Sequence, residues 1–168
     1  SKEILDVKYL FPPAQIMRRW SLKSGSPRRY EEYFYEFKNK FVDKLVIKDP
    51  YCGAGERQIK ALQSFIKMIN GLTGEFKIIE IYCKELNYRD RNYRSSSVVR
   101  NEIIQSLKNI VPIVPTVKII DFSYGRKFHD RSVVASIINE DGETTRHIYD
   151  LTGGIDFLMD TVKDTKIF

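Results

Sequence analysis

Two residues that could handle phosphate stand two positions apart in the last third of the chain. His129 precedes Arg131 in the stretch YGRKFHDRSVVAS. An imidazole can attack phosphorus or move a proton, and a guanidinium fork matches the nonbridging oxygens of a phosphate. The same histidine could instead only order the loop that enters a strand, hydrogen-bonded through Asp130. The pair therefore raises a phosphate-site hypothesis and leaves a purely structural role open.

A second basic cluster lies in the stretch NYRDRNYR, residues 87–94. Tyrosines alternate there with three arginines: Arg89, Arg91 and Arg94. Arginine forks bind phosphate oxygens and tyrosine rings stack on bases, which is the combination that nucleic-acid sites use. A solvated basic loop is about as good an interpretation, because surface loops are often charged.

Carboxylates are available near these cations, but their spacing pairs none of them. Asp49 and Asp121 stand at the ends of predicted strands, and either could form a structural ion pair with Arg131. A strand-end aspartate is more often a turn or cap residue than a catalytic group. No metal-ligand spacing and no Ser/His/Asp arrangement can be argued, so we expect no metal and no cofactor.

The composition indicates a soluble globular protein with a basic surface. The 168 residues are 42% hydrophobic and carry 28 Lys and Arg against 22 Asp and Glu, a net charge of +6. This excess favours anionic partners such as nucleic acid or acidic membrane surfaces. No apolar run is long enough to span a membrane, and Cys52 and Cys83 form no CxxC, so we expect reduced thiols in a cytoplasmic protein. The abrupt start at Ser1 leads us to expect part of a larger protein.

The N-terminal quarter predicts one aromatic helix. Ser26 and Pro27 form a helix-start signal, and aromatic residues follow at helical spacing. They are Tyr30, Phe34, Phe37 and Phe41. Such a stripe is usually core or interface packing. We treat residues 1–41 as an N-terminal extension with this helix.

Residues 42–168 predict an α/β domain. Apolar runs and periodicity predict strands at 45–47, 76–86, 115–123, 131–141 and 144–151, with helices around 59–69, 95–110 and 155–162. The first three strands should be parallel because helices connect them, and Asp141-Gly142 should turn the last two into a hairpin. The fold class is helix-on-sheet with a mixed, largely parallel sheet. Ligands should gather where the strands end, near Asp49, the 87–94 loop and His129.

Four motifs in order resemble the phospholipase D superfamily. They are VIKDPY, VKIIDF, FHDR and HIYDLTGGIDFL, within residues 42–162. The chain is most similar to the divergent branch that carries HDR where the enzymes carry HxK, which includes bacterial proteins and the C-terminal domain of ESCRT-associated MIT-domain proteins. The resemblance implies a phospholipase D-like sandwich.

The resemblance also assigns roles and shows two departures. His129 takes the place of the nucleophilic histidine and Arg131 that of the phosphate-binding lysine. Ser136 stands where the enzymes carry aspartate, and serine supplies no charge to orient the imidazole. The supporting residues would be Asp49, Asp130, Gly153, Gly154 and Asp156. One motif provides one histidine, and a homodimer would bring two together.

Three functions follow from this reading. The first is a catalytically degenerate module that binds a phosphate-bearing ligand, with nucleic acid favoured and anionic lipid close behind, as a homodimer within a larger chain. The second is a metal-independent phosphodiesterase or nuclease that uses His129 from each subunit. The third is a protein-interaction module built on the RRYEEYFYEF surface. The resemblance suggests a bacterial defence or mobile-element context for the first.

Overall fold

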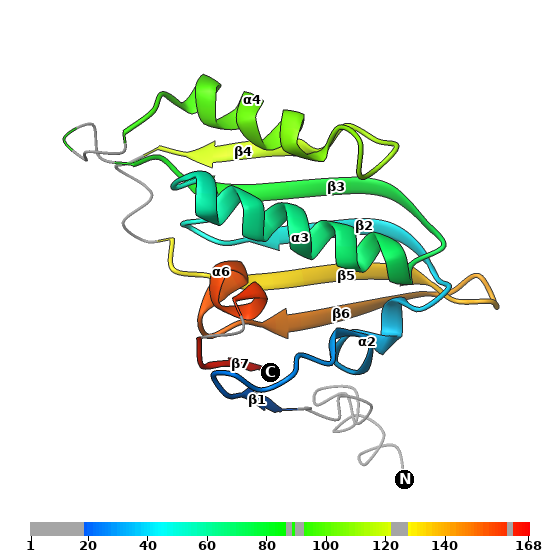
Figure 1. The fold of residues 1–168 in the computed structure, drawn as a ribbon. Helices are drawn as coiled ribbons and strands as arrows, with labels where there is room; N and C mark the ends of the chain where they lie inside the picture. The colour runs from blue at the N-terminus through cyan, green and yellow to red at the C-terminus, as the bar shows by residue number, and fades with distance from the viewer. Residues whose placement is uncertain (1–18, 87–88, 90–92, 122–127, 161–162) are drawn as a thin grey trace, which may run out of the picture.

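A five-stranded mixed sheet organises the molecule, with helices against one of its faces (Figure 1). The structure, a computed structural model, describes residues 19–86, 89, 93–121, 128–160 and 163–168. The strand order is β4-β3-β2-β5-β6. The strands are β2 (Phe41–Lys48), β3 (Glu75–Lys84), β4 (Thr116–Ile120), β5 (Ser132–Ile138) and β6 (Thr144–Asp150). The main helices are α3 (Glu56–Leu72), α4 (Ser96–Leu107) and α6 (Gly154–Met159).

The pairing confirms a mixed α/β fold. β2, β3 and β4 are parallel, as the helical connections α3 and α4 predict. β5 pairs antiparallel with β2 and with β6, and the hairpin turns at Gly142, whose φ is 84°. Two of the four pairings are therefore parallel and two antiparallel, so the sheet is evenly mixed and not largely parallel.

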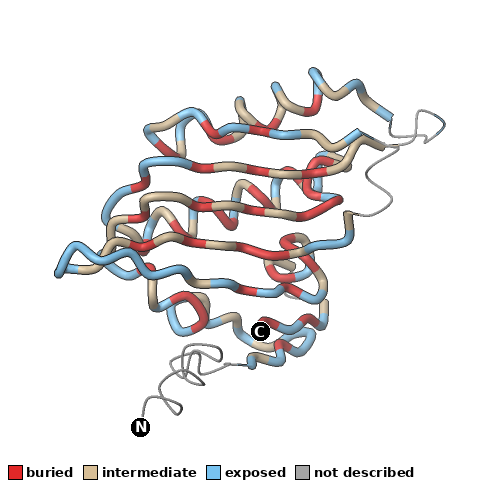
Figure 2. The backbone as a smooth tube through the Cα atoms, turned by 180° about the vertical axis from the view of Figure 1, so that it is seen from behind, coloured by how far each residue is buried: buried red, intermediate tan, exposed pale blue. Residues whose placement is uncertain are grey.

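The core lies between the sheet and the helices. α3 directs a stripe of side chains into it, including Leu62, Ile66 and Ile69, each fully buried. The strands contribute alternate residues such as Leu45 and Ile47, because successive side chains of a strand point to opposite faces. The tube view from behind shows the strands in front and the helices beyond them (Figure 2). In the described part of the chain, the helices cover one face of the sheet and leave the other open.

The predicted aromatic helix is wrong in its extent. Helical structure is limited to α2 (Tyr30–Tyr33) and the 3-10 turn η1 (Tyr35–Phe37), and Phe41 is already in β2. Asn39 adopts a φ of 58°, a left-handed conformation that ends the helical run.

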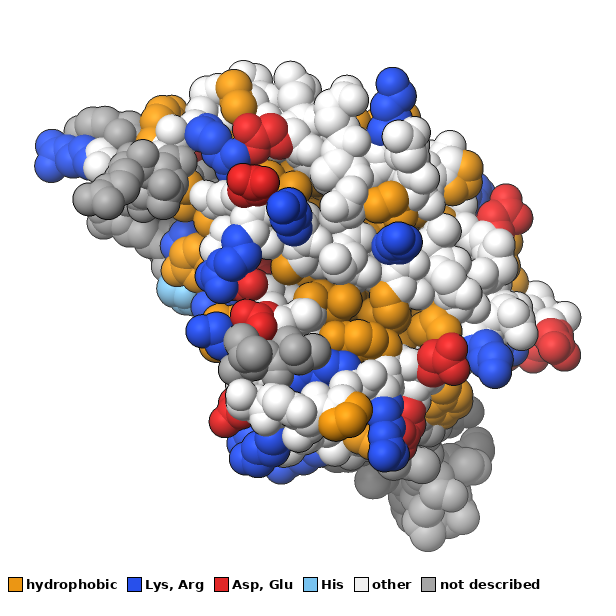
Figure 3. Space-filling model, in the orientation of Figure 1, with side chains coloured by type: hydrophobic (Ala, Val, Ile, Leu, Met, Phe, Trp, Pro, Cys, Tyr) orange, Lys and Arg blue, Asp and Glu red, His pale blue; other side chains and the backbone are white. Residues whose placement is uncertain are grey.

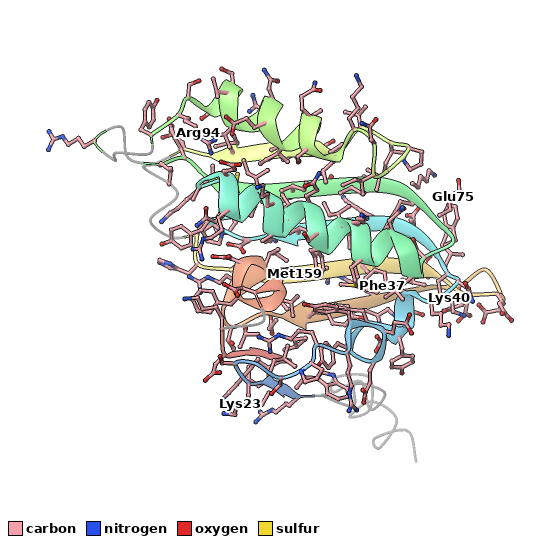
Figure 4. The ribbon with its side chains drawn as sticks, in the orientation of Figure 1. Lys23, Phe37, Lys40, Glu75, Arg94 and Met159 are labelled. Carbon is pink, nitrogen blue, oxygen red and sulfur yellow. The ribbon has the colours of Figure 1, made fainter. Side chains whose placement is uncertain are left out.

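The aromatic side chains themselves are core residues, as the stripe predicts. Phe34 and Phe37 are fully buried, and Phe34 packs on Phe65 and Tyr149 with ring centroids 5.6 and 5.0 Å apart. Phe37 lies against the sheet at its lower strands (Figure 4). The core therefore runs through the segment before residue 42.

A two-stranded ribbon ties the N-terminal segment to the C-terminal end of the chain. β1 (Trp20–Leu22) pairs antiparallel with β7 (Thr165–Ile167). Arg28 donates hydrogen bonds to the backbone carbonyls of Asp160 and Lys163. The N- and C-terminal parts of the described chain thus pack side by side (Figure 1).

Candidate phosphate-binding site

The floor of the candidate site is built by a buried aspartate and a left-handed glycine. Asp49 follows β2 and is only 4% exposed. Its Oδ1 accepts a hydrogen bond from the backbone N–H of Tyr51, at 3.0 Å, and its Oδ2 accepts one from that of Ile155, at 2.9 Å. The two backbone donors satisfy the carboxylate, so Asp49 fastens the start of α6 to the end of β2.

Each glycine of the Gly153-Gly154 pair makes a close contact that leaves no room for a Cβ. Gly154 has a φ of 71°, and a Cβ there would come within 2.5 Å of Asp49 Oδ2. A Cβ on Gly153 would come within 2.5 Å of the Phe157 side chain. A larger residue at position 154 would push the start of α6 away from Asp49, and one at position 153 would displace the Phe157 side chain. Gly153 and Gly154, which the resemblance indicated as supporting residues, therefore allow close packing at the start of α6.

Arg131 lies above this floor, at the entry to β5. It is half-buried, and its Nη1 donates a hydrogen bond to the Thr152 carbonyl at 3.1 Å. Its guanidinium carbon lies 5.5 Å from the centroid of the Tyr51 ring, a cation–π distance. No carboxylate among the described residues lies within 4.0 Å of the guanidinium, and Asp49 in particular forms no ion pair with it. Part of the donor capacity of Arg131 is therefore available to an anion.

A cavity of about 400 Å³ opens beside Arg131. His129 and Tyr51 line it, together with Pro50, Asp130, Asp150, Leu151 and Thr152. The histidine is exposed, so its ring is reachable from solvent. Figure 3 shows a histidine and several Lys and Arg side chains at the left edge of the molecule, where β2, β3 and β4 end. The structure thus places His129 and Arg131 on one hollow.

A second, smaller hollow lies on the other side of Arg131 and Tyr51. Its volume is about 230 Å³, and its lining includes Asp49, Gly153 and Asp156. Asp156 forms an ion pair with Arg57 of α3 at 3.0 Å, so its charge is compensated there. Arg131 therefore separates two hollows, of which the one beside His129 is the more open to an incoming phosphate.

Two further cations contact residues that line the larger cavity. Lys84 Nζ lies 3.1 Å from the Tyr51 hydroxyl and 4.3 Å from the centroid of its ring. Lys48 faces the Asp130 carboxylate at 4.0 Å, between two exposed side chains. The Tyr51 ring is thus contacted by Lys84 and by Arg131. Neither lysine was predicted as a site residue, although both alternate with buried strand residues, a pattern that places them on the exposed face of the sheet.

Of the predicted phosphate-binding arginines of the 87–94 stretch, the two that the structure describes, Arg89 and Arg94, do not line this cavity. Arg94 donates hydrogen bonds to the Glu102 carboxylate and, at 2.9 Å, to the Gly53 carbonyl. It therefore ties the loop to α4 and to the segment after β2 (Figure 4). Arg89 is exposed, and Arg91 lies outside the described residues.

The structure brings neither a carboxylate at position 136 nor a second histidine to His129. Ser136 is in β5, opposite Lys44 and Arg146 in the register, and brings no carboxylate to His129. His147 is on β6 opposite Ala135, and burial lowers its pKa. Within the described residues, His129 is thus the one histidine on the cavity.

A cysteine nucleophile is also excluded at this site. Cys52 borders the smaller hollow and is buried. A hydrogen bond with Cys83 and burial raise the pKa of the Cys52 thiol well above its usual range. A thiol held in its protonated form is a poor nucleophile.

Comparison with known proteins adds no family assignment. Protein-family models give no match to this chain, and curated proteins give none either. The likeness of the four motifs to the phospholipase D superfamily therefore stays a prediction. In the described part of the chain, no helix combines the length and the apolar character that crossing a bilayer requires.

Proposed function

We propose that this chain is a phosphate-binding module of phospholipase D-like type that has lost catalysis. The observation that carries the proposal is the open cavity on which Arg131 and His129 lie together, with no described carboxylate within 4.0 Å of the guanidinium. A guanidinium that is partly desolvated and partly unpaired binds phosphate more strongly than a solvated one.

The composition of the cavity wall supports binding over turnover. Asp130 is paired loosely with Lys48, and Arg131 is held by the Thr152 carbonyl and the Tyr51 ring. A phosphoryl-transfer mechanism of the superfamily type needs a nucleophile and a separate proton donor. One chain offers one histidine here, and the oriented carboxylate that would assist it is replaced by Ser136.

Nucleic acid is the ligand that we favour. Lys84 and Arg131 both contact the ring of Tyr51, which is 42% exposed. Alternating cations and aromatic rings bind a backbone that carries phosphates and bases together. An anionic lipid headgroup would satisfy the same arginine and is the second candidate.

The direct test is equilibrium binding of a fluorescein-labelled (dT)20 oligonucleotide by anisotropy, in EDTA and over a series of NaCl concentrations. Arg131→Ala should weaken binding about tenfold, because it removes a charge-assisted contact to phosphate. Binding by the wild type should also weaken steeply with salt, because phosphate contacts release counterions.

The matched control is Arg29→Ala. The Arg29 side chain, just before α2, is 75% exposed and pairs with Glu32 at 3.8 Å, so its substitution removes the same charge from a remote surface. Equal affinities for Arg131→Ala and wild type would overturn the proposed site. Binding to vesicles containing phosphatidylserine without binding to (dT)20 would select the lipid candidate.

The enzyme reading has its own test on the same samples. It needs two copies of His129 within reach of one phosphorus, which a homodimer would have to supply. Incubation of labelled (dT)20 in EDTA should leave it intact for both wild type and His129→Ala. Cleavage by wild type alone would replace our proposal with a metal-independent nuclease.

A further inference from the structure

We propose that single-stranded nucleic acid lies across the open face of the sheet, over the ends of β2, β3 and β4. Its phosphates would contact Lys48, Lys84 and Lys118, and a base would stack on Tyr82. This inference rests on the proposed function, because Arg131 would hold a further phosphate of the same strand.

The register places three of these residues in one row on the face of the sheet that no described helix covers. Tyr82 of β3 pairs with Lys48 of β2 on one side and with Lys118 of β4 on the other. Their chain neighbours Ile47, Ile81 and Val117 point into the core, so the row faces away from the helices. Neighbouring strands are about 4.8 Å apart, so the row spans roughly 10 Å.

The row repeats the arrangement seen around Tyr51. Lys118 Nζ lies 3.2 Å from the Tyr82 hydroxyl and 5.2 Å from the centroid of its ring. Lys48 Nζ lies 5.8 Å from the same centroid. Each of the two tyrosines therefore has two cations beside it, and Lys84, two residues beyond Tyr82, reaches Tyr51.

Two of the three lysines of this surface, Lys84 and Lys118, have no close carboxylate partner among the described residues, while Lys48 faces Asp130 at 4.0 Å. No carboxylate of the described residues lies within 4.0 Å of Lys84 Nζ or Lys118 Nζ. Glu80, one row away, accepts one hydrogen bond from the Tyr82 hydroxyl and pairs with Lys44 at 3.2 Å. The hydrogen bond with Tyr82 and the charge of Glu80 raise the pKa of Lys118, which is fully exposed. A linear polyanion would compensate these charges.

A strand of nucleic acid fits this surface better than the other occupants. A second copy packed face to face would bring the same lysines together, which is repulsive. A bilayer would need protruding apolar side chains, and the exposed Ile78 and Ile148 of this face lie on other rows. The row offers aromatic and cationic groups in alternation, which sequence-tolerant single-strand sites use.

The experiment compares two double variants in anisotropy titrations with (dT)20. Lys84→Ala with Lys118→Ala removes two proposed phosphate contacts. The control, Lys60→Ala with Lys67→Ala, removes the same charge from exposed positions of α3, on the opposite face. For single strands, the slope of log K against log salt is about −0.7 per phosphate contact, so the first variant should make that slope about 1.4 less negative. The control should leave it unchanged.

Tyr82 provides a readout that charge alone cannot mimic. Tyr82→Leu should weaken (dT)20 binding about tenfold with the salt slope unchanged, because stacking carries no counterion. Tyr82→Phe keeps the ring and should bind within about twofold of wild type.

The outcomes separate this inference from the proposed function. If Arg131→Ala weakens binding while the Lys84/Lys118 variant keeps both affinity and slope, the open-face path is wrong and the Arg131 site stands. If neither weakens binding, both fail. If the Lys84/Lys118 variant loses binding only to phosphatidylserine vesicles, the face binds a membrane and the inference is overturned.

Discussion

Two arginines near the same edge of the sheet are held in opposite ways. Arg94, before α4, donates to the Glu102 carboxylate and to the Gly53 carbonyl, and its side chain is 25% exposed. Arg131, before β5, donates to the Thr152 carbonyl and lies over the Tyr51 ring beside an open cavity. One charge is neutralised within the fold, and the other is held in place without a described carboxylate.

The contrast between Arg94 and Arg131 indicates that residue type alone does not define a phosphate site. Both arginines lie in loops at the ends of the parallel strands, where ligands usually bind. A guanidinium paired with a carboxylate would have to break that pair before it could bind phosphate. Arg131 has no such pair to break in the described structure. The contrast between the two regions can be tested by substitution, beginning with the backbone beneath Arg131.

The largest effect should come from Gly154→Ala. The substitution combines a φ of 71° with a Cβ 2.5 Å from Asp49 Oδ2. We expect the free energy of unfolding to fall by about 3 kcal/mol, because strain adds to the loss of buried hydrogen bonds by Asp49. Urea denaturation followed by circular dichroism measures it.

Gly142→Ala is the matched control for this substitution. Gly142 has a φ of 84°, and a Cβ there would meet nothing within 4 Å. It should cost about 1 kcal/mol from backbone strain alone. Equal losses for the two variants would show that the contact between Gly154 and Asp49 does not support the site.

Arg94→Ala should reduce stability by a smaller amount. We expect the free energy of unfolding to fall by about 1.5 kcal/mol, because Gly53 and Glu102 each lose a charge-assisted partner. The same denaturation measurement with Arg29→Ala should show a change within about 0.5 kcal/mol, as is usual for an exposed pair. If Arg94→Ala were as mild as Arg29→Ala, Arg94 would not be the structural arginine that we describe.

The smallest expected effect is on the pH dependence of stability, and it comes from His147. This histidine is partly buried, whereas His129 is exposed. Burial lowers the pKa of His147, and the nearby Glu36 charge opposes this only in part. The unfolded chain therefore takes up the proton first, and stability is lost as the pH falls below about 6.5, the ordinary histidine pKa. Between pH 7.5 and 5.0, the urea midpoint of wild type should fall more than that of His147→Gln. Parallel curves would contradict the embedded position of His147.

The sequence predicted the elements whose patterns are local. Periodicity located α3 and α4, and the apolar runs located β2 to β6, because each pattern reports one buried face. The aromatic spacing predicted a single helix through Phe41 wrongly, because the chain leaves the helical conformation before Asn39, whose φ is 58°. The spacing reflected burial instead: Phe34 and Phe37 pack on Phe65 and Tyr149, which lie far along the chain. The β1–β7 ribbon pairs two three-residue strands that lie near opposite ends of the sequence, and no local pattern predicts such a pairing.

The candidate site was predictable only in part. The cluster of Asp49, His129 and Arg131 at the strand ends followed from topology and motif resemblance. Arg94 is kept out of that cluster by its hydrogen bond to Glu102 of α4. The sequence alone did not predict that these two side chains meet. The row formed by Lys48, Tyr82 and Lys118 could not be predicted, because it depends on the strand register, which the sequence does not specify.

The most direct test of the account is a side-by-side titration of (dT)20 with Arg131→Ala and Arg94→Ala at one low salt concentration, with both variants verified as folded. We expect Arg131→Ala to bind about tenfold more weakly than wild type, while Arg94→Ala stays within about twofold. Equal losses for both variants, or a loss for Arg94→Ala alone, would contradict the claim that Arg131 is the arginine that the fold leaves available for phosphate.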